Sequence, residues 1–406
     1  MRVVIIGGGV SGLVAAISAK NKKNQVLILE RNSKCCKKLL LTGNGRCNYY
    51  NENQSIKFYH SSNNELLNQV IYHDNLLKVT SFFNKIGIVP RIKEGYYYPY
   101  SNQSISIENA LILTAKEKGI EIHTDTFVEN VEKEGDLFLI QTDNKSYSAE
   151  KVVISVGGMS YPKTGSDGNF YRILEGMGHT IIKPLPALVQ LNAVGSFLKN
   201  WSGIRVEANI KLYEDFSYVK EETGELLLTN YGVSGICVMQ LSGFVSRGLD
   251  LGKTEELVIN FLPAFCTCRD DFIRLLDERN KSLCLRDISE LLDTYLPYKL
   301  VNILIQYSSI SLHKKWNNLS FKEKNELAKN FVEFHLPVCG TNSFNSAQIT
   351  SGGVSLLDID LLTMQSRLIK DLYVTGEVLD VNGDCGGYNL TFAFLSGILA
   401  GSDICD

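Results

Sequence analysis

The sequence predicts an α/β protein in which a Rossmann-like dinucleotide-binding domain is interrupted by an inserted β-rich and helical domain. Three observations support this prediction. Residues 3–29 follow the order strand, glycine loop, helix, strand. Glycine loops of the kind that cradle phosphate recur towards the C-terminal end but are missing between about residues 190 and 340. The chain has 406 residues, which is enough for two or three domains.

The elements of the first part alternate between strands and helices. Residues 3–6 and 25–29 are apolar and read as buried parallel strands, and the alanine-rich residues 11–20 between them read as a helix. Helical spacing continues at residues 63–86 and 107–118, and a strand is expected at 120–123. Short strands at 127–131, 137–141 and 146–148, separated by turn residues, predict a β-meander that precedes a strand at 151–156.

The middle of the chain changes character. Strands are expected at residues 204–213, 225–228 and 257–262, and helices at 271–295, 301–307 and 321–334. After residue 340 a strand at 372–375 and a helix at 390–400 surround a further glycine loop. We therefore expect a cofactor domain built from residues 1–190 and 341–406, with an inserted substrate domain, partly β-barrel-like, at 191–340.

Composition restricts the function. Hydrophobic residues make up 44% and charged residues 21%, which excludes a disordered, collagen-like or coiled-coil chain. Basic and acidic residues number 41 and 44, and this balance predicts no nucleic-acid partner. No apolar run is long enough for a transmembrane helix, and the glycines at 7–9 disfavour a signal peptide. The ten cysteines lack zinc-ligand spacing, so we expect reduced thiols, no metal and a cytoplasmic location.

The first motif is the G-x-G-x-x-G pattern at residues 7–12, which lies between a strand and a helix. Gly7 allows a tight turn, Gly9 allows close approach of a pyrophosphate, and Gly12 allows the helix to pack on the sheet. Glu30 ends the next strand and is placed to hold ribose hydroxyls. The alternative is a structural glycine turn in an unrelated fold.

Two further loops have a cofactor interpretation and a plainer one. In residues 37–48, Gly43 and Gly45 would let the main chain approach a planar ring or phosphate, with Lys38 and Arg46 as cations, or the segment is an exposed turn. The strand at 152–156 ends in Gly157 and Gly158, which would lie beneath a nucleotide. Tyr161 and Lys163 follow, and they either reach a substrate or decorate a loop.

The fourth motif lies between the strand at 372–375 and the helix at 390–400. Its glycine loop, with Gly386 and Gly387, delivers a helix N-terminus, which would stabilise the negative charge of a reduced flavin. The alternative is a capping loop without a ligand.

Together these motifs resemble the YhiN-like FAD-dependent oxidoreductases, a group that includes BaiN-type and aminoacetone-oxidase-type flavoproteins. The resemblance is carried by LTGNGRCN at residues 41–48, QITSGGV at 348–354 and the segment from GEVLD to LAG at 376–401. It implies a flavoprotein of the type with two dinucleotide-binding domains, with non-covalent FAD. It implies hydride transfer between flavin and a small organic substrate, with NAD(P)H or oxygen as electron partner.

The resemblance also implies which residues contact the cofactor. These are Gly7, Gly9, Val10, Ser11, Gly12, Glu30, Arg31, Lys38, Thr42, Gly43, Gly45, Arg46, Cys47, Asn48, Val128, Gly157, Gly158, Gly376, Glu377, Gly386, Gly387, Tyr388, Asn389 and Leu390. Tyr388, Tyr161 and Lys163 are the candidate catalytic residues.

The inserted region follows the family pattern less closely. Asn230 and Ile236 stand where family members usually have histidine and proline. Two other functions stay open: a flavin-binding sensor or adaptor without turnover, and a tRNA-modifying flavoprotein.

Overall fold

The computed structural model describes residues 1–405, which form two compact units. The first unit combines residues 1–185 with the chain from residue 348 onward, and the second is Pro186–Ala347. The sequence placed these boundaries at residues 190 and 340. The inserted unit extends beyond both predicted limits, because residues next to strand β18 (Phe334–Thr341) and before residue 190 also contact it. The Val189 N–H donates to the Ser242 hydroxyl at 3.1 Å, and the Asn342 N–H donates to the Gln190 carbonyl at 3.0 Å.

The first unit contains a seven-stranded sheet with the order β20-β21-β22-β11-β1-β2-β7. Its central parallel strands consist mainly of apolar residues that are buried, as expected for a sheet between helical layers, whereas the parallel edge strand β7 is not buried. The strands are β1 (Arg2–Ile6), β2 (Gln25–Leu29), β7 (Glu121–His123), β11 (Lys151–Ile154) and β22 (Leu372–Val374), with antiparallel β20 (Ile359–Asp360) and β21 (Gln365–Ser366) at one edge.

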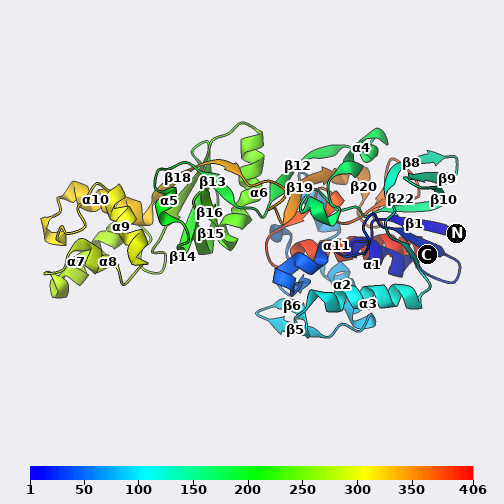
Figure 1. The fold of residues 1–406 in the computed structure, drawn as a ribbon, viewed down its shortest axis with the longest axis horizontal. Helices are drawn as coiled ribbons and strands as arrows, with labels where there is room; N and C mark the ends of the chain where they lie inside the picture. The colour runs from blue at the N-terminus through cyan, green and yellow to red at the C-terminus, as the bar shows by residue number, and fades with distance from the viewer. Residues whose placement is uncertain (406) are drawn as a thin grey trace. The chain divides into compact units, whose positions relative to one another are not determined.

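Helix α1 (Val10–Ala19) packs against the long C-terminal helix α11 (Tyr388–Cys405), so both ends of the chain lie in the same unit (Figure 1). Small residues make this packing close. A side-chain carbon on Gly397 would lie 2.5 Å from the carbonyl oxygen of Ser11, and one on Gly401 would lie 2.5 Å from that of Ala15.

Smaller elements complete the first unit. The predicted meander is present as β8 (Val128–Glu134), β9 (Leu137–Thr142) and β10 (Ser146–Ala149). Helices α2 (His73–Lys85), α3 (Ser104–Glu117) and α4 (Asn169–Gly176) surround the core. The short strands are β3 (Tyr50–Asn51), β4 (Tyr59–His60), β5 (Pro90–Lys93), β6 (Tyr96–Pro99), β12 (Ile181–Ala187), β19 (Ile349–Val354) and β23 (Asn382–Gly383).

The inserted unit is a closed six-stranded barrel with the order β13-β16-β15-β14-β17-β18, together with helices. The other strands are β13 (Leu191–Ala193), β14 (Arg205–Glu214), β15 (Ser217–Leu228), β16 (Gly232–Ser234) and β17 (Glu255–Asn260). The helices are α5 (Leu198–Trp201), α6 (Ile236–Asp250), α7 (Arg269–Leu283), α8 (Ile288–Leu292), α9 (Tyr298–Tyr307) and α10 (Phe321–Val332). Its buried apolar residues form a core separate from that of the first unit.

Three predicted helices differ from the structure. Residues 63–86 form a 3₁₀ segment (Asn64–Gln69) and then α2, because the side-chain amide of Asn75 donates to the Val70 carbonyl at 3.2 Å, a carbonyl that a continuous helix would pair with a backbone N–H. Residues 271–295 are divided into α7 and α8, because Asp287 and Glu290 make a capping box that starts a new helix. The third helix ends at Val332, and Phe334 begins β18.

Within residues 1–405, no helix combines the length and the apolar character that crossing a membrane requires.

Candidate dinucleotide-binding site

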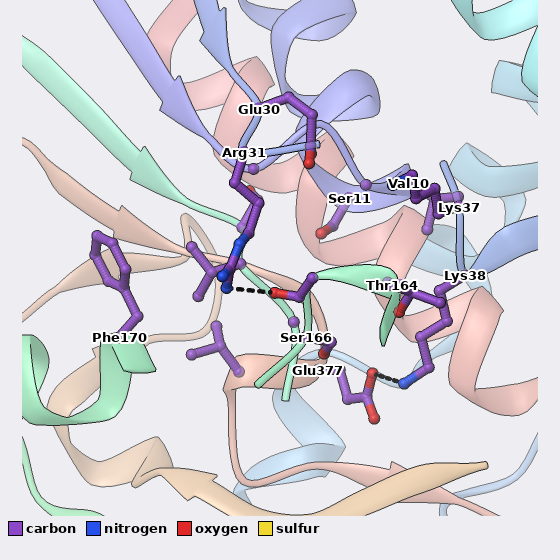
Figure 2. A pocket seen from close by; sticks show the side chains of 18 of the residues that line it. Val10, Ser11, Glu30, Arg31, Lys37, Lys38, Thr164, Ser166, Phe170 and Glu377 are labelled. Atoms are coloured by element: carbon purple, nitrogen blue, oxygen red, sulfur yellow. Dashed lines mark hydrogen bonds and ion pairs between the residues drawn. The ribbon is translucent and has the colours of Figure 1, made fainter. Parts of the chain in front are cut away.

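A cavity lies at the carboxyl ends of β1, β2 and β11, where Ile6, Leu29 and Ser155 line it. All of its lining residues belong to the first unit. In open α/β sheets, ligands bind outside the carboxyl ends of the strands. The cavity is therefore placed where the fold positions a dinucleotide, and Figure 2 shows the side chains around it.

The first glycine loop forms one wall of this cavity. Gly7 follows β1 and has a φ of 103°, and its N–H donates to the Leu29 carbonyl at 2.8 Å. A side chain on Gly12 would collide with the carbonyl oxygen of Gly7, so glycine is required for α1 to approach the loop. A side chain on Gly9, in contrast, would meet no atom within 4 Å. The open space beside Gly9, which lines the cavity, is room for a ligand.

The N-terminus of α1 faces the same cavity. The helix begins at Val10, and its cap residue Gly9 makes no side-chain hydrogen bond to the first turn. The first backbone N–H groups of a helix have no partner within the helix and carry partial positive charge. Since Val10 and Ser11 line the cavity, these donors are suited to an anionic diphosphate.

Glu30 connects the end of β2 to the glycine loop. Its carboxylate accepts the N–H of Gly8 at 2.7 Å and the N–H of Asn32 at 2.7 Å, and it is buried. The Asn32 side chain donates to the same carboxylate at 2.6 Å. An ionised carboxylate has about four acceptor positions, so Glu30, which lines the cavity, can still accept a hydroxyl of a ligand.

Arg31, the residue after Glu30, also lines the cavity. Its guanidinium pairs with Asp167 at 2.7 Å and donates to the Gly165 carbonyl at 3.2 Å. It also lies over the ring of Phe127, 4.8 Å from the ring centre. Together with Val128, these residues surround the part of the cavity next to Glu30.

A second polar group lines the cavity at Lys38 and Glu377. The two side chains form an ion pair at 2.6 Å. The exposed fraction of the side chain is 24% for Lys38 and 21% for Glu377. Ser160 and Thr350, which are fully buried, contact Glu377 from behind. In Figure 2 the ion pair lies below Val10 and Ser11, whereas Arg31 lies to the left of Ser11.

The N-terminal turn of α11 adds an apolar edge. Leu390, Phe392 and Ala393 line the cavity, together with Asn389. The Asn389 side chain accepts the N–H of Gly383 at 2.7 Å and donates to the carbonyl of Gly383 at 2.8 Å. This exchange holds the C-terminal glycine loop against the start of the helix.

The cavity gathers about half of the cofactor residues that the sequence predicts. Those that line it are Gly7, Gly9, Val10, Ser11, Glu30, Arg31, Lys38, Thr42, Val128, Gly157, Glu377, Asn389 and Leu390. Those that do not line it are Gly12, Gly43, Gly45, Arg46, Cys47, Asn48, Gly158, Gly376, Gly386, Gly387 and Tyr388.

The residues outside the lining make contacts within the protein. Arg46 donates from its Nε to the Gly43 carbonyl at 3.2 Å. A side-chain carbon on Gly376 would lie 2.5 Å from the Ser11 hydroxyl, and one on Gly387 would lie 3.0 Å from the Asn48 side chain. These glycines allow segments to pack behind the cavity, so their direct contact with a cofactor stays a prediction.

None of the three candidate catalytic residues lines the cavity. The Tyr388 hydroxyl donates to the Asn53 carbonyl at 3.0 Å, and its ring stacks on Phe58 with centres 4.7 Å apart. Burial raises the pKa of Tyr388 to about 12. Tyr161 and Lys163 lie at the short 3₁₀ segment Pro162–Thr164, where Lys163 is exposed. The geometry of these side chains does not support a role at the cavity.

The sequence reasoning missed several lining or supporting residues. Ser166, Phe170 and Tyr171 line the cavity, and Thr350 supports Glu377 from β19. Thr350 could have been found from the sequence, because it lies in the segment at 348–354 that carries the family resemblance. No contact was assigned to that segment. Ser166 and Gly168 continue the third glycine stretch, but the sequence reasoning assigned them no contact. Phe170 and Tyr171 belong to no motif, so nothing in their pattern indicated the cavity.

Among residues 1–405, no group of three or more His, Cys, Asp or Glu side chains is arranged to hold a metal ion.

Comparison with known proteins gives matches along nearly the whole chain. Residues 1–403 match the family model described as HI0933-like protein Rossmann domain. The chain is 35% identical to the 3-dehydro-bile acid delta(4,6)-reductase of Clostridium scindens, over 98% of both chains. It is 26% identical to the ribosomal RNA dihydrouridine synthase of Escherichia coli, over 99% of this chain and 97% of that protein.

A solved structure has the same fold at lower identity. It is the 3-ketosteroid-delta4-(5alpha)-dehydrogenase of Rhodococcus jostii RHA1 in complex with 4-androstene-3,17-dione, with a TM-score of 0.51 and 14% identity. The match covers 100% of this chain and 96% of that chain.

Proposed function

Because the chain belongs to the HI0933-like protein Rossmann domain family and is an FAD-dependent oxidoreductase, we propose that it reduces a carbon–carbon double bond conjugated to a carbonyl group. The proposed substrate is a small organic molecule, and FAD is bound without a covalent link. The family membership and the Rossmann-like fold confirm the predicted family, fold class and enzyme class.

The residues of the cavity fit FAD. The open space beside Gly9 and the uncapped start of α1 suit a diphosphate, and Glu30 can accept ribose hydroxyls. The cavity continues past Ser11 to Lys38, Glu377 and the apolar edge of α11, which leaves room for a flavin ring at that end.

The proposed reaction, reduction of a double bond, is based on the reactions that the names of two relatives describe. The relative with 35% identity is a delta(4,6)-reductase of a 3-dehydro-bile acid, so it acts on double bonds of a ketone-bearing molecule. The relative with 26% identity makes dihydrouridine, which is uridine with two added hydrogens. Both names describe the addition of two hydrogens to an unsaturated ring, and this shared chemistry supports the proposal.

The protein contributes binding and electrostatics to this reaction. When bound, FAD in its reduced form supplies the hydride. The start of α1 would hold the diphosphate and Glu30 would hold the adenosine ribose. The apolar side chains of Leu390 and Phe392 would keep water from the flavin end of the cavity. The ammonium group of Lys38 adds a fixed positive charge at that end.

Non-covalent binding is supported by the chemistry of the lining. Cys36 is the cysteine that lines the cavity within residues 1–405, and burial raises its pKa well above the ordinary value. Burial also raises the pKa of the Cys47 thiol, to about 12. A protonated, buried thiol is a poor nucleophile, so neither residue is suited to forming a bond to the flavin.

The remaining proposals rest on composition. A net charge of −3 supports a small-molecule substrate rather than a nucleic acid. All ten cysteines are free, which supports a cytoplasmic location, where thiols stay reduced.

One experiment tests the proposed function. The purified protein is expected to show flavin absorbance that moves to the supernatant after heat denaturation and filtration. The anaerobically photoreduced protein is then mixed with 4-androstene-3,17-dione or with its 4,5-saturated analogue. We expect the conjugated ketone to restore the oxidised flavin spectrum and to gain two hydrogens by mass spectrometry. Reoxidation by oxygen alone, with no conjugated ketone consumed, would contradict the proposal.

Uridine in ribosomal RNA is the second candidate substrate, favoured by the dihydrouridine synthase relative that matches 99% of this chain. The same reduced protein is incubated with a ribosomal RNA transcript, and dihydrouridine is measured by mass spectrometry of the nucleosides. Formation of dihydrouridine without turnover of conjugated ketones would replace the first proposal by the second.

A further inference from the structure

We propose that the ion pair of Lys38 and Glu377 sets the reduction potential of the bound FAD, with Lys38 favouring reduction and Glu377 opposing it. This proposal rests on the proposed function, because it requires FAD in the cavity. It assigns a role to two residues that the sequence indicated only as cofactor contacts, and it extends that role to Ser160 and Thr350 as the groups that position the pair.

The hydroxyl groups of Thr350 and Ser160 form a chain of hydrogen bonds in which each donates towards Glu377. The Thr350 hydroxyl accepts the N–H of Met159 at 2.8 Å and that of Ser160 at 3.2 Å, so its own proton is left for the Ser160 hydroxyl at 3.0 Å. The Ser160 hydroxyl in turn donates to Glu377 Oε1 at 2.7 Å. Glu377 Oε1 also accepts the N–H of Thr350 at 2.9 Å.

This direction fixes the charges of the pair. Every contact made by Glu377 in this cluster is one in which its carboxylate accepts, which is the arrangement of an ionised group. Lys38 donates to Glu377 Oε2 at 2.6 Å and to the Ser160 hydroxyl at 3.2 Å. An ammonium group has three donors, so one donor of Lys38 remains for a ligand in the cavity that it lines.

The position of the pair is the flavin end of the cavity. Glu30 and the start of α1 account for the ribose and the diphosphate of the adenosine half. Glu377 follows Gly376, whose backbone packs on Ser11 just beyond the diphosphate position. Lys38 and Glu377 therefore lie where the chain of the cofactor continues towards its flavin, on the side away from Arg31 (Figure 2).

The ion pair would act on the negative charge that the isoalloxazine ring of FAD gains when it is reduced. Two electrons and one proton enter the isoalloxazine ring, so the ring gains one negative charge. In the test, dithionite supplies the electrons and is oxidised to sulfite. Because the pair is partly buried, its fields are less screened than those of exposed charges. Lys38 then stabilises the charge that reduction adds, and Glu377 destabilises it.

The test compares Lys38→Met and Glu377→Gln by the two-electron midpoint potential of bound FAD and by the Kd of oxidised FAD. We expect Lys38→Met to lower the potential and Glu377→Gln to raise it. A tenfold change in the equilibrium constant, which is about 30 mV for two electrons, is the expected size. The double variant is expected between the two single variants.

Three results would overturn the inference. If both variants shift the potential in the same direction, they disturb the cavity rather than its charge. If Lys38→Met weakens oxidised and reduced FAD equally, the potential stays constant, and Lys38 binds the diphosphate instead. If neither variant moves the potential while both still bind FAD, the pair is structural.

Lys37→Met is the matched control, since it removes one positive charge from the same cavity. Lys37 pairs with Asn32 at 2.8 Å, and Asn32 belongs to the Glu30 end. Because Lys37 contacts the Glu30 end of the cavity, we expect Lys37→Met to shift the potential less than Lys38→Met does. A wild-type protein that takes up no FAD at all would contradict the proposed function itself, whereas a flavin-loaded protein with unresponsive potentials would contradict only the role of the pair.

Discussion

Tyr388 lies in the most specific C-terminal motif, yet its polar group is satisfied inside the protein. Its hydroxyl donates to the Asn53 carbonyl, and its ring stacks on Phe58 and makes an edge contact with Tyr59. Glycine-rich motifs indicate where a backbone approaches a ligand, but they do not reveal the direction of a neighbouring side chain. The assignment of Tyr388 as a proton donor therefore stays a prediction that its surroundings do not favour.

Replacing Tyr388 by Phe tests this assignment. The variant loses one buried hydrogen bond, which costs about 1 kcal/mol of unfolding free energy. We expect FAD affinity and turnover to stay within about twofold of the wild type, because no cavity contact is removed. Urea unfolding and steady-state turnover check both parts. A large loss of turnover with normal FAD binding would restore Tyr388 as a catalytic residue.

The position of Gly9 and Gly12 relative to helix α1 determines what each of these glycines of the first motif does. Gly12 lies inside α1, where a methyl group would collide with the Gly7 carbonyl, whereas a methyl group on Gly9 would project into open space. We expect Gly12→Ala to unfold at lower temperature by several degrees and to lose FAD. Gly9→Ala should keep its unfolding temperature without FAD but bind FAD at least tenfold more weakly.

Circular dichroism melting of the FAD-free variants and fluorescence titration with FAD separate these effects. The two variants carry the same chemical change three residues apart, so each is the control for the other. Equal stability of both FAD-free variants would show that the close approach of α1 to the loop is not needed.

The start of β17 predicts a pH effect in the inserted unit. Glu255 is buried, no hydrogen bond reaches its carboxyl oxygens in the described part of the chain, and burial followed by nearby Glu214 raises its pKa to about 8. Above its ordinary pKa of 4.5, the unfolded chain releases a proton that the folded chain keeps. This contribution to stability is therefore largest at low pH and falls as pH rises towards 8.

Glu255→Gln should remove this fall, which amounts to about 1 kcal/mol per pH unit between pH 6 and 8. Glu256→Gln is the control, because Glu256 is the next residue and pairs with His335 at 3.0 Å. Urea unfolding at pH 6, 7 and 8 gives the slopes. If the Glu255→Gln slope equals that of the wild type, the carboxyl group is ionised in the folded protein.

The sequence predicted well those helices and strands whose bounds depend on residues within or next to the element itself. The strand, loop and helix of residues 3–29 follow from apolar runs and from Gly7 and Gly12, so their bounds agree within a residue or two. Helix α6 was not predicted at all. It begins at Ile236, where family members usually have proline, and proline at the first position is a common start signal that this chain lacks.

At the scale of the molecule, two separate hydrophobic cores predict two unfolding steps. The cavity lies in the first unit alone, so FAD should stabilise only the step in which that unit unfolds. At a free FAD concentration of 100 times Kd, the gain is about 2.7 kcal/mol. Calorimetry with and without FAD measures both steps. Equal displacement of both transitions by FAD would show that the units unfold together.

The insertion of one unit into the cofactor domain was predictable from the sequence, but the residues at which the inserted unit begins and ends were not. Glycine motifs at both ends indicated a single cofactor domain, since each motif needs the same sheet. The barrel was only partly predictable, because β13 and β16 are three residues long. Strand β13 is defined by its pairing with the distant strands β16 and β18. The motifs predicted Lys38 and Glu377 as cofactor contacts, but not that these two side chains pair with each other and with Ser160, because the three residues come from distant segments.

The close seam between α1 and α11 has a consequence for the synthesis of the protein in the cell. Gly397 and Gly401 fit against α1, and β22 fits beside β11, so the first unit lacks part of its interior until those residues have left the ribosome. At about 5–20 residues per second, the roughly 220 residues that follow residue 185 take on the order of 10–40 s to make. During that interval the apolar faces of α1 and β11 are exposed, which makes nascent chains of this protein natural clients for chaperones.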